Sequence, residues 1–186
     1  MSYLRTFLPW IIFAVLPSGQ WQWAALAALV VAVAVIVRQR RAGAGFDALI
    51  IETGSAAFFA VLAVIAFTDP HSPVHDYSAA ASSGTLAVVA GVSLAIGKPF
   101  TLGIAKRTTP RELWGLRPFI RTNVVITAVW TAAFALTAVV LAVVAHAGNA
   151  HSTTATLIQV AGFVIPMVFT VRYVAAVQAK AGAGAA

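Results

Sequence analysis

The sequence predicts an all-α, polytopic helical membrane protein, and its composition and charge distribution lead to this fold class. Of 186 residues, 61% are hydrophobic and only 9% are charged, with a mean hydropathy of +0.92. A soluble domain of this size cannot bury so much apolar surface. Twelve Lys and Arg residues outnumber five Asp and Glu. They cluster beside hydrophobic segments, where basic residues set membrane orientation, so we expect no nucleic-acid partner.

Five segments are predicted to cross the membrane completely. A hydrocarbon core of about 30 Å needs roughly 20 helical residues. Four segments meet or approach this length: residues 46–67, 79–97, 122–145 and 153–177. The fifth, residues 21–37, would reach only about 26 Å as a helix. It can still cross because Trp21 and Trp23 suit the membrane interface at one end.

The first hydrophobic segment, residues 4–16, is short and would span only about 20 Å as a helix. Pro9 interrupts it and Pro17 closes it. Two interpretations stay open, a short tilted span and a re-entrant half-helix. A cleaved signal peptide is the alternative interpretation, because Arg5 precedes a short apolar run. We expect the segment to be retained.

The cations predict the orientation. They cluster in residues 38–41 and in the connection 98–121, and Arg172 and Lys180 lie near the chain end. The opposite connections contain no Lys or Arg: residues 17–20, 68–78 and 146–152. Because basic residues stay on the cytoplasmic side, we expect both termini there and three helical hairpins. One domain covers residues 1–178, followed by an Ala/Gly-rich tail, residues 179–186, that we expect to be disordered.

Small residues along the fourth segment predict a helix-packing face. They recur at helical spacing: Ala80, Gly84, Ala87, Gly91 and Ala95. In membranes such faces let backbones approach closely. The groove that these small residues form either packs against another helix of the same chain or meets a second protomer. Assembly into a homo-oligomer therefore stays an open alternative.

Polar residues form a stripe on each of the last two helices. The first stripe holds Asn123, Thr127 and Trp130; the second holds Gln159, Thr170 and Tyr173. We interpret both mainly as contacts between packed helices, because each polar group is neutral and short. The alternative is that they line a pathway for water or substrate.

Glu52 is the only acidic residue clearly inside a hydrophobic segment. Intramembrane carboxylates are costly and often functional. We expect a structural ion pair near the cytoplasmic end, with Arg38, Arg40, Arg41 or Arg121 as partner. A role in proton or cation movement is the alternative.

The connection 98–121 predicts a lipid-contacting segment. Thr109, Pro110 and Glu112 form a capping box, from which we expect a short interfacial helix. Its lipid contacts are expected from four side chains: Arg107, Arg111, Trp114 and Arg117.

No chemistry-bearing motif appears. The chain has no cysteine, and it contains no nucleophile elbow, zinc-protease helix or phosphate-binding loop. We therefore expect no enzyme activity and no cofactor. The spacing of His71 and His75 beside Asp69 and Asp76 makes metal capture conceivable, but Pro70 and Pro73 disfavour a regular helix there. We predict no metal site.

The layout resembles the septation protein A family, the inner-membrane-spanning proteins also called YciB. The second span ends in basic residues, and the matching positions are Phe7, Leu8, Pro9, Lys98, Pro99, Asn123, Trp130 and Phe134. The chain departs from the family pattern in its longer, Thr-rich connection and its Phe100-Thr101-Leu102 run. These departures weaken the transfer of partner contacts.

The resemblance implies a multi-pass protein of the bacterial plasma membrane that takes part in envelope maintenance or division through other membrane proteins. Our leading hypothesis is accordingly a non-enzymatic protein acting through protein or anionic-lipid contacts at its basic face. The alternative is a small transporter or channel with a pathway near Glu52 and Asn123.

Overall fold

The computed structural model describes the chain except for residues 1–6, 17, 44, 46–48 and 184–186, and it describes side chains up to residue 179. The described part is all-helical, without a strand. Its elements are α2 (Leu8–Val15), η1 (Ser18–Gln20), α3 (Trp21–Arg41), α4 (Ile50–Thr68), α5 (Val74–Ala95), α6 (Phe100–Ala105), η3 (Arg111–Leu113), α7 (Arg117–His146) and α8 (Thr153–Ala183).

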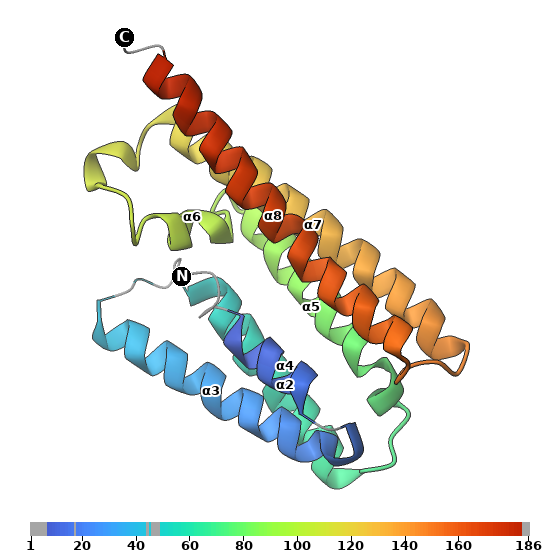
Figure 1. Ribbon diagram of the computed structural model, residues 1–186. Coiled ribbons are helices and arrows are strands. Elements are labelled where there is room, and N and C mark those ends of the chain that lie inside the picture. Colours follow the sequence, from blue (N-terminus) through green and yellow to red (C-terminus); the bar gives the residue numbers. More distant parts are fainter. Residues whose placement is uncertain (1–6, 17, 44, 46–48, 184–186) are drawn as a thin grey trace.

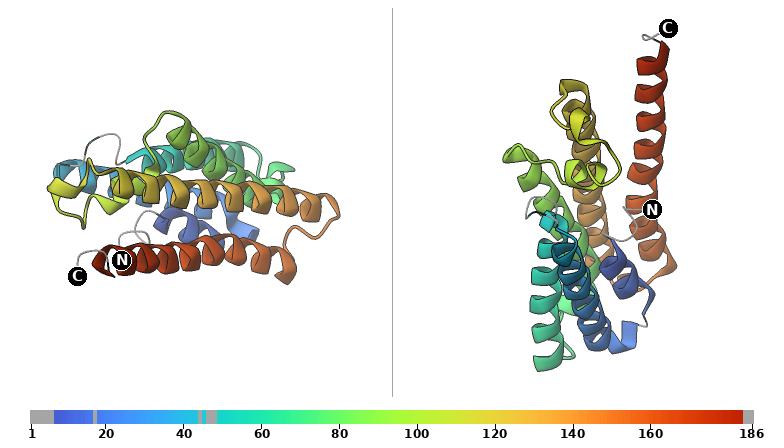
Figure 2. Two further views of the ribbon diagram at one scale, coloured as in Figure 1. Left: turned by 90° about the horizontal axis from the view of Figure 1, so that it is seen from above. Right: turned by 90° about the vertical axis from the view of Figure 1, so that its left-hand side faces the viewer.

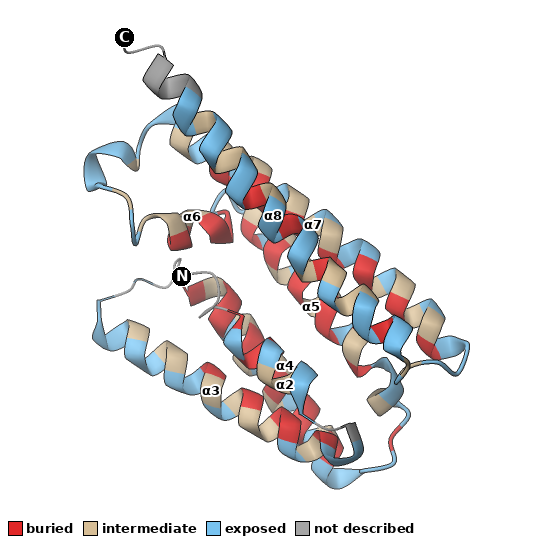
Figure 3. Ribbon diagram, in the orientation of Figure 1, coloured by how far each residue is buried: buried red, intermediate tan, exposed pale blue. Residues whose placement is uncertain are grey.

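Five helices are long and apolar enough to cross a membrane, which confirms the predicted spans: α3, α4, α5, α7 and α8. Large apolar side chains such as Val64, Leu136 and Val171 are exposed on their outer surfaces. Figure 3 shows these exposed stretches alternating with buried positions along each helix. Because lipid solvates apolar side chains, this surface is the one expected of a multi-pass membrane protein.

The helices run back and forth between two ends of the bundle (Figure 1). At the basic end, α3, α5 and α8 finish, α4 and α7 begin, and α6 and η3 lie between α5 and α7. The opposite end carries all four histidines, and we call it the histidine end. Figure 2 shows the end of α8 and the α6–η3 connection at the same end. The alternating direction of the helices agrees with the predicted arrangement as three helical hairpins.

Helix α2 is too short to cross the membrane. Its eight residues extend for about 12 Å. The Phe7 ring before it stacks on Trp130, with 5.0 Å between ring centroids, and Trp130 lies near the middle of α7. From there α2 runs toward the histidine end and η1 (Figure 1). The described part is therefore a half-helix, and the predicted segment's residues 4–6 lie outside the description.

The small-residue face of α5 packs against α7, the helix it contacts most extensively. A Cβ atom added to Gly84 would lie 3.8 Å from the Ala138 Cβ, and one added to Gly91 would lie 3.4 Å from the Thr131 Cγ2. The groove thus closes inside the bundle, as one of the two sequence-based interpretations proposed.

We expect Gly84→Leu to lower the free energy of unfolding by about 1–3 kcal/mol, because the larger side chain forces α5 and α7 apart. Gly84→Ala should be tolerated, since 3.8 Å is ordinary van der Waals contact. Thermal unfolding in detergent measures both. The control is Val88→Leu, at an exposed position of α5; if it destabilises the protein as much as Gly84→Leu, the close approach is unimportant.

The expected disordered tail is partly wrong. Helix α8 continues to Ala183, beyond the boundary predicted at residue 178. Alanine is the strongest helix former, so an Ala-rich segment can extend a helix that the membrane span has already nucleated. Residues 184–186 lie outside the described residues.

Candidate functional site

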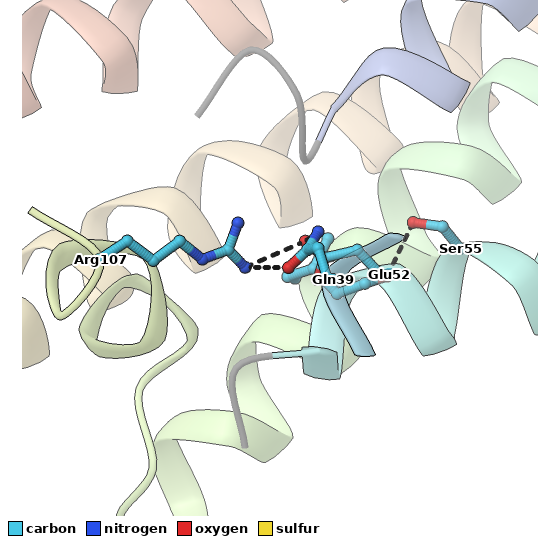
Figure 4. Close-up of polar contacts among 5 residues, drawn as sticks. Gln39, Glu52, Ser55 and Arg107 are labelled. Atoms are coloured by element: carbon cyan, nitrogen blue, oxygen red, sulfur yellow. Dashed lines mark hydrogen bonds and ion pairs between the residues drawn. The ribbon is translucent and has the colours of Figure 1, made fainter. Parts of the chain in front are cut away.

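Glu52 lies in a polar cluster at the basic end, which we call the Glu52 cluster: Gln39, Glu52 and Arg107 (Figure 4). Gln39 Nε2 donates to Glu52 Oε1 at 2.9 Å. Arg107 Nη2 lies 3.5 Å from the same carboxylate oxygen and donates to Gln39 Oε1. The Glu52 side chain is only 3% exposed and that of Arg107 26%. A buried carboxylate is thus neutralised by a cation that reaches in from the surface.

Three elements build the cluster. Gln39 lies in the last turn of α3 and Glu52 in the first turn of α4. The positive end of the α4 helix dipole lies at this first turn and stabilises a carboxylate there. Arg107 follows α6, so it brings the connection between α5 and α7 onto the α3–α4 pair. The cluster therefore ties the two halves of the bundle together at this end.

The structure confirms an ion pair at Glu52, and its partner Arg107 is not one of the four predicted arginines. Arg38, Arg40, Arg41 and Arg121 are exposed. On α3, the buried face runs through Ala28 and Ala32 and reaches position 39 at helical spacing. Gln39 consequently points inward while the neighbouring arginines do not. That spacing was the sequence signal that could have identified Gln39.

Arg107 was assigned to lipid contact, yet its guanidinium contacts Glu52 and Gln39. The reason is the inward docking of α6, which the sequence did not predict. Phe100 and Ile104 are buried. Thr101 Oγ1 lies 2.9 Å from the Asn123 carbonyl oxygen, to which it donates, and 2.8 Å from Thr127 Oγ1. These contacts fix α6 on α7 and direct residue 107 toward α4.

The predicted capping box and interfacial helix are also wrong. Residues Arg111–Leu113 form only a short 3-10 helix, preceded by Pro110 in an extended conformation and without a side-chain cap. Trp114 Nε1 donates to the Thr109 carbonyl at 2.9 Å. Lys106 Nζ and the Arg111 guanidinium lie over its ring, 5.3 and 5.7 Å from the centroid. Trp114 thus folds back on its own connection, and Arg111 remains exposed.

The polar stripe of α7 faces the interior, where its groups are paired. Asn123 Nδ2 donates to the Phe119 carbonyl at 2.9 Å, and Trp130 Nε1 donates to Thr170 Oγ1 at 3.0 Å. Among the described residues, every buried side-chain nitrogen and oxygen has a hydrogen-bond partner. The arrangement agrees with polar contacts that join helices.

Aromatic rings fill the space around this stripe. Trp130 contacts a group of rings that we call the aromatic cluster: Phe7, Phe100, Phe134 and Phe163. Their centroids lie 5.0–6.4 Å from that of Trp130, the range of favourable aromatic pairs. Aromatic rings therefore pack closely in the middle of the bundle.

The remaining predicted site residues do not assemble with Glu52. Gln159 lines a cavity of about 230 Å³ at the histidine end. Tyr173 stacks on Phe169 with 5.3 Å between centroids, Lys98 is exposed, and Pro99 is buried before α6. Comparison of the chain with models of protein families, with curated proteins and with solved structures finds no match.

Proposed function

We propose that this chain is a non-enzymatic protein of the bacterial inner membrane whose basic end faces the cytoplasm and binds anionic lipid head groups. One observation carries the proposal. The α6–η3 connection is fixed to the bundle by Phe100, Thr101 and Arg107. Exposed cations surround it at the same end: Arg38, Arg41, Lys98, Arg111, Arg117 and Arg121.

Electrostatics supports this assignment. Each Lys or Arg near an anionic leaflet contributes about 1 kcal/mol of attraction. A connection held by packing keeps its cations at a fixed height without the ordering cost that a flexible loop pays on binding. The same cations favour the cytoplasmic side for this end.

The cellular context we propose follows from the resemblance to the septation protein A family: maintenance of the cell envelope or cell division. In that setting the basic end would also meet other membrane proteins, or a second copy of the chain. Lipid binding is the part of the proposal that the exposed charges support most directly.

The alternative function, movement of an ion or small solute near Glu52 and Asn123, has less support. The Glu52 carboxylate is already matched by Arg107 and Gln39. The aromatic cluster occupies the middle of the bundle between this carboxylate and the cavity at the histidine end.

Neutralising three exposed cations tests the lipid proposal. We expect the variant Arg111→Gln/Arg117→Gln/Arg121→Gln to bind short-chain phosphatidylglycerol roughly 100-fold more weakly in a calorimetric titration, since about 3 kcal/mol of attraction is removed. Arg107 is left intact because it belongs to the Glu52 cluster.

The matched control is Arg111→Lys/Arg117→Lys/Arg121→Lys, which keeps the charge and should keep most of the affinity. Phosphatidylcholine should bind weakly to all three proteins. Equal affinity of the neutral variant and the native protein for phosphatidylglycerol would refute the proposal.

A further inference from the structure

Three metal-ligating side chains meet at the histidine end, and we call them the histidine–aspartate cluster: His75, Asp76 and His151. Their ligand atoms all lie within 4.8 Å of one another. His151 Nε2 is 3.0 Å from Asp76 Oδ1, and the two imidazole rings have centroids 4.6 Å apart. His75 and Asp76 lie in the first turn of α5, whereas His151 lies in the connection between α7 and α8.

His75 is held in place by a packed tryptophan. Its ring stacks on Trp21 of α3, with 5.0 Å between centroids and 21° between planes. Trp21 is buried, and its Nε1 donates to the Pro70 carbonyl at 3.0 Å. A packed tryptophan thus orients the imidazole, as supporting groups orient the ligands of metal sites.

The other two side chains remain accessible. Those of Asp76 and His151 are 55% and 45% exposed. A cavity of about 230 Å³ adjoins His151, and its wall combines apolar residues with the polar side chains of Ser78, Thr156 and Gln159. It also has His75 and His151 in its wall, so water reaches the cluster.

We propose that the histidine–aspartate cluster binds a divalent ion of the zinc class. Two imidazole nitrogens and one carboxylate oxygen form a donor set that Zn²⁺ and neighbouring transition metals take. Ligands about 2.0–2.1 Å from a tetrahedral zinc ion are about 3.3 Å apart. The pair His151–Asp76 is already near that spacing, and rotation of these exposed side chains closes the longer separations.

The ion would have three protein ligands and a water molecule from the cavity as the fourth. Local charge favours a cation, because this end carries Asp69 and Asp76 while residues 18–20, 68–78 and 146–152 contain no Lys or Arg. The site would cross-link the start of α5 to the α7–α8 connection. It is independent of the lipid contacts proposed for the basic end.

The sequence predicted no metal site, and the spacing there suggested a different ligand set, His71 and Asp69 with His75 and Asp76. In the structure Asp69 Oδ1 instead accepts from the His71 backbone amide at 3.2 Å. Pro73 precedes α5 and allows the helix to start at Val74, and the third ligand comes from a connection 75 residues away.

The test is a zinc titration of the full chain, purified in detergent without a histidine tag and treated first with a chelator. We expect one Zn²⁺ per chain, measured by competition with a chromophoric chelator. His75→Ala, Asp76→Asn and His151→Ala should each weaken binding by at least the roughly 10-fold that losing an outer-shell group costs. Cobalt should give the d–d absorption of a four- or five-coordinate ion.

Two other histidines at the same end provide matched controls. His71→Ala and His146→Ala should bind zinc with native affinity. Thermal unfolding in the presence of chelator shows whether each variant is folded, and Asp76→Glu offers a further variant that retains a carboxylate. Absence of saturable zinc binding by the native chain would overturn the proposal. So would equal losses in the control and cluster variants, which would indicate unspecific histidine binding.

Discussion

Arg107→Ala is expected to destabilise the protein by about 3 kcal/mol, and Glu52→Gln by much less. Removing the arginine takes a cation away from a carboxylate that is almost fully buried, and breaking a buried pair from one side typically costs this much. Removing the negative charge instead leaves a guanidinium that is already partly exposed and can turn to water. Gln39 retains a hydrogen-bonding partner in Glu52→Gln.

Thermal and denaturant unfolding of the four proteins in a double-mutant cycle measures this asymmetry. In the double variant, Glu52→Gln should restore most of the stability lost in Arg107→Ala, because the uncompensated charge is gone. Arg111→Ala is the matched control, since it removes an exposed arginine from the same connection. Losses of equal size for Arg107→Ala and Arg111→Ala would contradict a structural ion pair.

Trp130→Ala is expected to lower the free energy of unfolding by about 3–5 kcal/mol, the range for large aromatic residues in packed cores. Trp130 is completely buried and joins the rings of α6, α7 and α8 with that of Phe7. Its loss leaves a void in the middle of the bundle. Lipid cannot compensate, because contacts inside the protein supply most of the packing energy in a membrane.

Trp130→Phe separates ring packing from hydrogen bonding. It keeps an aromatic ring but loses the bond to Thr170, so we expect a smaller loss, about 1 kcal/mol from the hydrogen bond plus a contribution from the reduced volume. Trp23→Ala, at an exposed position, should have little effect on unfolding in detergent. Equal losses for Trp23→Ala and Trp130→Ala would contradict a central role for the aromatic cluster.

Much of the fold could be predicted because it depends on local properties of the chain. Length and hydropathy define α3, α4, α5, α7 and α8. The repeat of small residues predicts the α5 face that approaches α7 at Gly84 and Gly91, but not the more deeply buried α5 face that holds Ser82, Leu86 and Ala90. The repeat of polar residues predicts the buried face of α7. These signals require only the period of a helix, which any single segment displays.

The site contacts could not be predicted because they join segments that are distant in sequence. Arg107 reaches Glu52 only because α6 turns inward, and a six-residue helix is too short to give a clear periodic pattern. The histidine–aspartate cluster needs the ends of two hairpins to meet. Even the pairing of Phe7 with Trp130 depends on how deeply α2 enters the bundle.

Helix α7 has 30 residues and is therefore about 45 Å long, whereas the hydrocarbon layer is about 30 Å thick. This hydrophobic mismatch is relieved by tilting or by projection of the helix beyond the acyl chains. Arg117 and Arg121 occupy the first turns of α7. The part of α7 that projects beyond the acyl chains therefore lies at the basic end. Bilayer thickness consequently sets the depth at which these two cations stand, and a thicker membrane draws them closer to the acyl-chain boundary.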